Sequence, residues 1–281
     1  MANPPHNKSS QQGQGAEHSF LLDLAHDFGG AILFSLPLLM TMEMWWLGFY
    51  MDRFRLALFL VFAFVIVMGL SYFEGGEETF KIEVLDAFTA CAVGYVVATI
   101  MLFLFGILKP GMSADEVIGK LALHAVPCSI GAILARRQLG AEETHKEQRR
   151  VEQYGGKIFL MGIGAIFLAF QLAPTEEMVL IGQQITDWHA VVLALLSLGI
   201  MQAFLYSIEA KGRPSSFSAD FFWGVFIRLT IVGYALVLLL SLYVLWSFGR
   251  LEGEALTEAL RSILVLGFPA ALGAAAARLI L

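Results

Sequence analysis

Two acidic residues that fall within long apolar stretches, Glu43 and Glu177, are the side chains of this sequence best suited to chemistry inside a membrane. An ionised carboxylate in lipid is costly, so it usually faces the protein interior and marks a functional position. Two neighbouring carboxylates can share one proton, or can coordinate a cation together with carbonyl oxygens. We therefore interpret Glu43 and Glu177 as a candidate site for a proton or an inorganic cation.

The residues just before each glutamate strengthen this interpretation. A threonine stands two positions earlier in both cases and could add a hydroxyl ligand, and a proline lies nearby. Proline removes a backbone donor and can break a helix, and broken helices at a repeat interface are one way to build an ion site in lipid. The predicted ion-binding residues are Glu43, Glu177, Thr41 and Thr175, with helix breaks at Pro37 and Pro174.

A second interpretation treats the same carboxylates as interfacial or structural. Trp45, Trp46 and Tyr50 resemble an aromatic belt at a membrane boundary, so Glu43 could lie near the end of its span. Glu176 and Glu177 could likewise belong to a loop between shorter helices.

Arg228, His124 and Glu176 are the candidates for gating or for counter-ions. Arg228 stands alone in an apolar stretch, so we expect an acidic partner, for which Glu43, Glu177 and Asp220 are candidates. The pair could be a switchable counter-ion or a fixed salt bridge. His124 could relay protons, because histidine titrates near neutral pH, although a hydrogen-bonded core histidine is the plainer alternative.

Other chemistries find little support in the sequence. Met40, Met42 and Met44 could suggest a copper path, but on a helix Met42 points away from the other two. No Walker motif, zinc-binding His-Glu-x-x-His helix or Gly-x-Ser-x-Gly elbow is present. We therefore predict no metal site, no cofactor and no enzymatic activity.

The elements that must position these residues are membrane-spanning helices. Of the 281 residues, 58% are hydrophobic and 15% are charged, and the charges cluster between long apolar runs. A helix needs about 20 apolar residues to cross a bilayer, and the sequence provides such runs repeatedly. We predict an all-α, polytopic membrane helix bundle with about eight spans, near residues 30–50, 56–73, 85–108, 113–135, 157–181, 190–208, 221–246 and 256–281.

The two halves of the chain resemble each other. Moving the second half back by 134 positions aligns Gly30 with Gly164 and Glu43 with Glu177. The last span of each half carries the same Pro-x-x-x-Gly-Ala-x-x-Ala-Arg pattern, starting at Pro127 and at Pro269. This similarity predicts two tandem, parallel four-helix repeats, related by an axis along the membrane normal, that bring the first and fifth spans together.

Polar segments divide the chain further. We expect residues 1–19 to be a disordered polar tail, 20–139 to be the first repeat, 140–156 to be a charged linker and 157–281 to be the second repeat. Residues 20–28 should form a short interfacial helix. Lys and Arg are more frequent on the side that holds both termini, which predicts cytoplasmic termini in an inner (plasma) membrane of bacterial type.

The first span, from Gly29 to Trp46, resembles a bacterial family of integral membrane proteins without assigned function. The resemblance covers most of the chain after the tail and implies no particular activity.

Three functions remain open from the sequence. The first is an ion channel or secondary transporter for protons or cations, built on the paired glutamates. The second is a membrane scaffold or sensor without transport, and the third is a lipid-modifying membrane enzyme. The expected partners are the lipid bilayer and an inorganic ion or proton, with a homo-oligomer as a possible assembly; nothing in the net charge of −6 indicates nucleic-acid binding.

Overall fold

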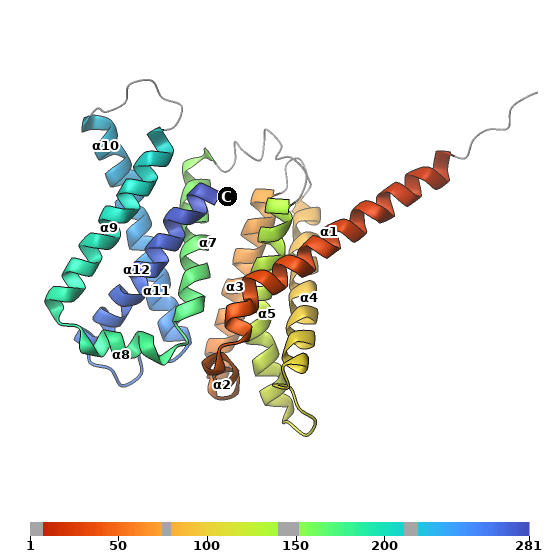
Figure 1. The fold of residues 1–281 in the computed structure, drawn as a ribbon, viewed down its shortest axis with the longest axis horizontal. Coiled ribbons are helices and arrows are strands. Elements are labelled where there is room, and N and C mark those ends of the chain that lie inside the picture. The colour runs from red at the N-terminus through yellow and green to blue at the C-terminus, as the bar shows by residue number, and fades with distance from the viewer. Residues whose placement is uncertain (1–7, 75–79, 140–151, 211–218, 281) are drawn as a thin grey trace, which may run out of the picture.

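The part of the chain that the structure describes is built from helices alone, as predicted. A computed structural model describes residues 8–74, 80–139, 152–210 and 219–280. The first group of helices is α1 (Lys8–Leu39), α2 (Met42–Tyr50), α3 (Arg53–Glu74), α4 (Phe80–Leu104) and α5 (Ala114–Leu139). The second group is α7 (Tyr154–Leu172), α8 (Glu176–Gln184), α9 (Asp187–Ala210), α10 (Ala219–Val225), the π-helix η1 (Phe226–Ile231), α11 (Val232–Ser247) and α12 (Leu256–Ile280) (Figure 1).

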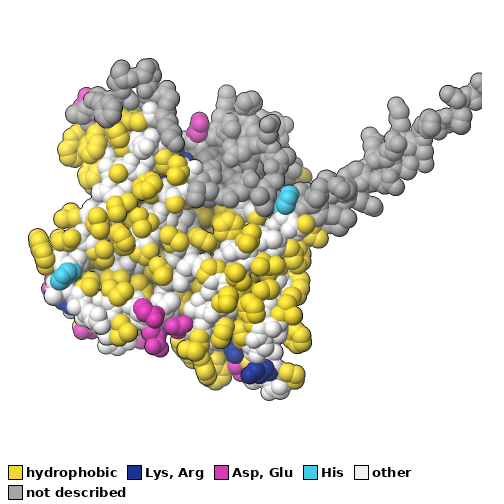
Figure 2. Space-filling view, in the orientation of Figure 1, with side chains coloured by type: hydrophobic (Ala, Val, Ile, Leu, Met, Phe, Trp, Pro, Cys, Tyr) yellow, Lys and Arg dark blue, Asp and Glu magenta, His cyan; other side chains and the backbone are white. Residues whose placement is uncertain are grey.

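The lengths of these helices suit a membrane. Among the described residues, seven helices are long and apolar enough to cross one, and the bent pair Leu24–Leu39 and Met42–Tyr50 makes eight if it counts as one span. Large apolar side chains such as Leu33, Phe103 and Leu195 are exposed on the outer faces of the helices. Figure 2 shows hydrophobic side chains over the middle of one face and charged ones toward its upper and lower edges. Such a wide apolar surface fits contact with lipid.

Two of the predicted spans are shorter than expected. The first ends at Leu39, and α2 then turns away by 85°. The fifth ends at Leu172, and α8 begins after a break of three residues. We name the end of the bundle that contains α2, α8 and residues 105–113 and 248–255 the α2/α8 end. The start of α7 and the ends of α9 and α12 lie at the opposite end (Figure 1).

The N-terminal segment differs from its prediction. Helix α1 begins at Lys8 and runs without interruption to Leu39, so residues 8–19 are helical and residues 20–28 belong to the same helix instead of a separate interfacial one. Figure 1 shows the first part of α1 leaving the bundle. Nothing between Lys8 and Leu36 removes a backbone donor, so the helix of the membrane segment can continue outward. Residues 1–7 and most of the predicted linker, 140–151, lie outside the described residues.

Each group is held together by a close helix crossing at matched glycines. A Cβ added at Gly30 would stand 2.6 Å from the carbonyl oxygen of Gly131, and one added at Gly164 would stand 2.1 Å from that of Gly273. The pairs are related by offsets of 134 positions in α1 and α7 and 142 positions in α5 and α12. Small residues allow such approaches in lipid. These matched crossings support the predicted duplication, which stays a prediction.

We expect Gly164→Ala to destabilise the protein, because the new methyl group would meet backbone atoms of Gly273 that cannot move aside. Overpacking of this kind costs about 1–3 kcal/mol. Gly199→Ala on α9 is the matched control, since a Cβ there meets nothing within 4 Å. Thermal unfolding of both variants in detergent measures the difference. Equal stability of the two would contradict a tight α7–α12 crossing.

The two groups meet through aromatic side chains. Phe59 of α3 contacts Phe170 of α7 and Phe248, with ring centroids 5.2 Å and 5.4 Å apart. The hydroxyl of Tyr243 on α11 donates a hydrogen bond to the carbonyl of Leu58 at 3.1 Å. Helices α1 and α7 also touch, as the parallel arrangement predicts. The contact region between the groups is therefore mainly apolar.

Candidate functional site

The predicted helix breaks lie close to the expected positions, but only one of them is at its proline. Pro37 stays inside α1, which continues to Leu39, whereas Pro174 lies in the turn between α7 and α8. The hydroxyl of Thr41 donates to the carbonyl oxygen of Pro37 at 2.6 Å, and that of Thr175 donates to the carbonyl oxygen of Leu172 at 2.7 Å. The Thr41 hydroxyl therefore satisfies a carbonyl group that the helix break leaves free, whereas the Leu172 carbonyl also accepts the amide of Thr175 at 3.1 Å.

The glutamates lie at the starts of the two short helices. Glu43 is in the first turn of α2, and Glu176 and Glu177 are in the first turn of α8, where a negative charge is favoured by the helix dipole. Glu43 is partly exposed and Glu177 is exposed. Helix α2 packs on α5 and α8 packs on α12, and among the described residues no hydrogen bond or ion pair involves either glutamate. The structure places both at the α2/α8 end and does not bond them to each other.

A different set of ionisable groups lies deep in the first helix group. Glu116, Lys120 and His124 follow one another at intervals of four residues, so they share one face of α5, about 6 Å apart along its axis. The Nζ atom of Lys120 is 2.6 Å from Oε1 of Glu116, and these side chains are only 11% and 23% exposed. His124 is fully buried. Helix α5 packs against α1, α2, α3 and α4 and is the most enclosed of the candidate spans.

The hydrogen bonds of His124 determine which ring nitrogen carries its proton. Nδ1 lies 2.7 Å from the backbone carbonyl oxygen of Lys120. A carbonyl oxygen can only accept, so Nδ1 must be the donor, and in the neutral ring Nε2 then holds the lone pair. Nε2 is buried and has no hydrogen-bond partner among the described residues. His124 is therefore hydrogen-bonded, as the plainer prediction had it, and also retains an open proton acceptor.

A cavity of about 450 Å³ connects Glu116 and Lys120 with the α2/α8 end of the bundle. Carboxylate and amine groups meet aromatic rings in its wall. Its lining residues are Trp45, Trp46, Phe105, Gly106, Ile107, Lys109, Met112, Glu116 and Lys120. Water in the cavity can thus reach the buried Lys120–Glu116 pair, one helical turn from His124.

Polar groups continue beyond His124 toward the opposite end of the bundle. Cys128 lies one turn further along α5 and is fully buried. On α1, Ser35 and Asp27 are also buried, at 0% and 1% exposure, and the Ser35 hydroxyl donates to the carbonyl oxygen of Ala31. Asp27 has an interaction partner of its own. We call the six groups the α5 column: Glu116, Lys120, His124, Cys128, Ser35 and Asp27.

Among the described residues of the second helix group, the equivalent positions form no such column. Helix α12 makes the same set of contacts in its group, with α7, α8, α9 and α11, as α5 makes in the first. At the positions equivalent to Lys120, His124 and Cys128, however, α12 carries a serine and two apolar residues. The residues that correspond to the column are Glu258, Ser262, Leu266, Ala270, Ala169 and Met161. Packing in this position therefore does not require a buried lysine or histidine.

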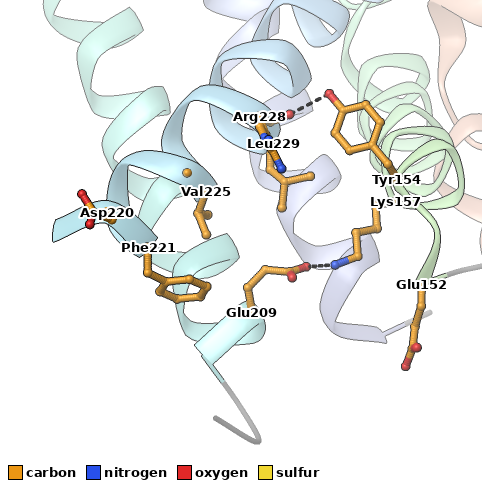
Figure 3. Close-up of a pocket in the computed structure, with 10 residues that line it drawn as sticks. Glu152, Tyr154, Lys157, Glu209, Asp220, Phe221, Val225, Arg228 and Leu229 are labelled. Atoms are coloured by element: carbon orange, nitrogen blue, oxygen red, sulfur yellow. Dashed lines mark hydrogen bonds and ion pairs between the residues drawn. The ribbon is translucent and has the colours of Figure 1, made fainter. Parts of the chain in front are cut away.

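The second group instead has an ion cluster at the end opposite α2 and α8. Glu209 of α9 pairs with Lys157 of α7 and with Arg278 of α12, the latter at 3.2 Å. The three side chains are 17%, 18% and 8% exposed. The cluster borders a cavity of about 320 Å³ that also contains Asp220 and Arg228 (Figure 3).

Arg228 does not have the predicted acidic partner. It is exposed in this cavity and forms no ion pair with any described residue. Its backbone carbonyl accepts a hydrogen bond from the hydroxyl of Tyr154, at the start of α7, at 2.8 Å. Glu177 follows the other end of this 19-residue helix, about 28 Å away, and Glu43 also lies at that end. Only Asp220, among the predicted partners, shares the cavity with Arg228.

Sequence reasoning missed two of these features. Glu209 directly follows the predicted sixth span, where charged residues are ordinary, and Lys120 lies seven residues inside the predicted fourth span. The spacing of Glu116, Lys120 and His124 within an apolar helix was the signal that could have identified the column.

Long apolar helices, an apolar outer surface and buried ionic groups define an integral membrane protein. Residues 23–281 match the family described as "Putative integral membrane protein (DUF2391)", and the chain belongs to this family. No curated protein and no solved structure matches the chain.

Proposed function

We propose that this integral membrane protein moves protons across the bilayer along the α5 column. The observation that carries the proposal is the open Nε2 atom of His124, a proton acceptor buried inside a membrane helix and without a partner among the described residues. A buried polar atom without a partner is costly, so its retention favours a function that uses it. The proposal involves no catalytic reaction and no cofactor.

The arrangement of charges supports proton transfer at this position. A proton that reaches Nε2 turns the ring into an imidazolium ion, and Nδ1 remains bonded to the Lys120 carbonyl. The Glu116 carboxylate favours this cation, whereas the Lys120 ammonium opposes it, so their ion pair keeps the net charge near the ring small. Release of the proton from Nε2 toward Cys128, Ser35 and Asp27 restores the neutral ring.

The contrast between the two helix groups also supports a specific role. Leu266 and Ala270 occupy the positions in α12 that His124 and Cys128 occupy in α5. A pair of packing helices with the same glycine crossing thus exists in an apolar form within the same chain. The ionisable groups of α5 add nothing that the crossing needs, and they do cost desolvation.

The orientation forms part of the proposal. Lys and Arg are more frequent on the side of the membrane that holds both termini, which predicts that the termini face the cytoplasm of a bacterial-type inner membrane. The cavity beside Lys120 would then open on the opposite, outer side, and the cluster of Lys157, Glu209 and Arg278 would lie near the cytoplasmic surface. Protons would enter through this cavity beside Glu116 and Lys120 and leave near Asp27.

Proton flux into proteoliposomes tests the proposal. Purified protein is reconstituted with a pH-sensitive dye inside the vesicles, and a potassium-diffusion potential drives protons inward. We expect acidification well above that of empty liposomes, with no change when external sodium replaces choline. Vesicles that acidify no faster than empty ones under either polarity of the potential would refute proton transport.

The glutamate variants separate the two candidate sites. If the α5 column carries protons, Glu43→Gln and Glu177→Gln should retain wild-type flux, because neither residue belongs to the column or to the lining of the cavity at its entrance. If the paired glutamates form the ion site, both variants should lose flux or change cation selectivity. Each variant is compared at equal protein content and with a monodisperse elution profile. Loss of flux in both would transfer the site from His124 to the glutamates.

A further inference from the structure

A second ligand site lies in the other helix group, at the end of the bundle away from α2 and α8. Its cavity of about 320 Å³ is lined by the starts of α7 and α10, the end of α9 and the π-helix η1. Lys157 and Glu209 in its wall are paired with each other, and Arg278 also binds Glu209. These three groups are therefore paired with one another. The remaining charged residues of the cavity wall are Glu152, Asp220 and Arg228.

Charged groups of both signs in this cavity have no ion-pair partner among the residues that the structure describes. Arg228, Asp220 and Glu152 are exposed, and none of them makes an ion pair with a described residue. Figure 3 shows Arg228 between the helix that carries Asp220 and the side chains of Tyr154 and Lys157. A guanidinium group in a membrane helix is expected to bind an anion, and if the protein supplies none, a ligand can.

The backbone around Arg228 is unusual in the same place. Residues Phe226–Ile231 form a π-helix, which is rare and is frequently found at functional positions. In the wider turn each carbonyl bonds an amide five residues later instead of four. The Tyr154 hydroxyl donates a hydrogen bond to the Arg228 carbonyl in this turn. The π-helix thus places the Arg228 cation and a widened backbone turn at the same point of the cavity wall.

The depth of the charges indicates what kind of ligand fits. Asp220 is the first residue of its candidate span, at the membrane boundary, and Arg228 lies eight residues deeper, about 12 Å along the helix. The cation is therefore nearer the membrane interior and the anion nearer the water. A phospholipid with an aminoethyl headgroup has the complementary order, because its phosphate adjoins the acyl chains and its ammonium faces the water.

The outer surface of the same helices suits the acyl chains of such a lipid. Trp223, Ile227 and Ile231 are 55%, 58% and 46% exposed beside the cavity. A tryptophan at the boundary and apolar residues below it are the usual neighbours of a bound lipid. We propose that the cavity binds a zwitterionic phospholipid, with its phosphate on Arg228 and its primary ammonium on Asp220.

Lipid retention by the purified full-length protein tests this proposal. The protein in detergent is mixed with equal amounts of dioleoyl phosphatidylethanolamine, phosphatidylcholine and phosphatidylglycerol, and native mass spectrometry measures the bound lipids. We expect a roughly two- to fivefold preference for the ethanolamine lipid over phosphatidylglycerol, which is the range of an exposed ion pair. The preference over phosphatidylcholine should be smaller, because its quaternary ammonium keeps the charge but donates no hydrogen bond. Equal retention of the three lipids, or a preference for phosphatidylglycerol, would overturn it.

Two variants assign the headgroup contacts. Asp220→Asn should remove the preference for the ethanolamine lipid and leave total retention unchanged. Arg228→Gln should lower the retention of all three lipids about tenfold, because a charge-assisted, bidentate contact with phosphate is lost. Lys109→Gln, a cation in the other cavity, is the matched control and should match wild type. A wild-type pattern in Asp220→Asn or Arg228→Gln would refute the assignment.

A soluble competitor distinguishes the lipid from its headgroup alone. Glycerophosphoethanolamine carries the same phosphodiester and ammonium groups without acyl chains, and we expect it to displace little lipid at an equal concentration. Full displacement would show that the site takes a soluble phosphate ester and would overturn the lipid proposal. Asp220 and Arg228 lie outside the α5 column and outside the cavity at its entrance, so proton flux in Asp220→Asn and Arg228→Gln should remain at the wild-type level whichever ligand binds.

Discussion

Proton flux should fall about 100-fold when His124 is replaced by leucine, the low end of what a positioned proton-transfer group contributes. Leucine cannot accept a proton, so the column would lose its central group between Lys120 and Cys128. The protein should still fold, because Leu266 occupies the equivalent position of α12 in the second group. Flux into proteoliposomes, measured at equal protein content, gives the change.

A histidine outside the column provides the control for this variant. His189 is exposed at the start of α9 and bonds to the hydroxyl of Thr186 at 2.7 Å. His189→Leu should keep wild-type flux. His124→Gln preserves a polar side chain but does not accept a proton at neutral pH, so it should be as inactive as His124→Leu. Normal flux in a monodisperse His124→Leu protein would rule out the relay.

The largest loss of stability should come from Glu209→Gln. This change removes the only described anion between Lys157 and Arg278, whose side chains are 18% and 8% exposed. Breaking a buried ion pair by removing one partner costs about 3–5 kcal/mol, since the remaining charge stays desolvated. Thermal unfolding of the purified variant in detergent, at low and high salt, measures the loss.

A second substitution separates this penalty from a general packing defect. Adding Lys157→Met to Glu209→Gln removes one of the two stranded cations, so the double variant should be more stable than Glu209→Gln alone. The two changes should therefore be strongly non-additive, as expected for groups in direct contact. Additive losses, or a wild-type melting temperature for Glu209→Gln, would show that the cluster contributes no net stability.

The helical class and the number of spans could be read from the sequence because lipid forces backbone groups to pair within each segment. Long apolar runs then have few alternatives to a helix. At the start of α5 the amide of Glu116 donates a hydrogen bond to the hydroxyl of Ser113 at 3.3 Å, as a Ser-x-x-Glu sequence at a helix N-terminus favours. The helix breaks were harder to position. Pro37 lies within α1, and the break follows three residues later, where the indole of Trp45 bonds the carbonyl of Leu39.

The candidate site was less predictable than the fold. The paired glutamates stood out because they match between the two halves, yet matched positions also arise where both halves need an acidic helix start. The α5 column does not repeat, so comparison of the halves could not find it. The spacing of Glu116, Lys120 and His124 indicates a shared helix face, but only the packing of α5 shows that His124 is fully buried and that Lys120 is nearly so.

Most of the tryptophans lie at the α2/α8 end of the bundle, so their fluorescence can report the orientation of the protein in a membrane. Of the protein's five tryptophans, Trp45 and Trp46 lie in α2, Trp188 lies in the first turn of α9 and Trp246 in the last turn of α11, where the Arg55 guanidinium lies 5.2 Å from the centre of its ring. Only Trp223, in α10, lies at the opposite end. An aqueous quencher that cannot cross lipid therefore reaches very different shares of the fluorescence from the two sides of a vesicle. The unlabelled protein reports which way it has inserted, and flux can be assigned a direction without any added tag.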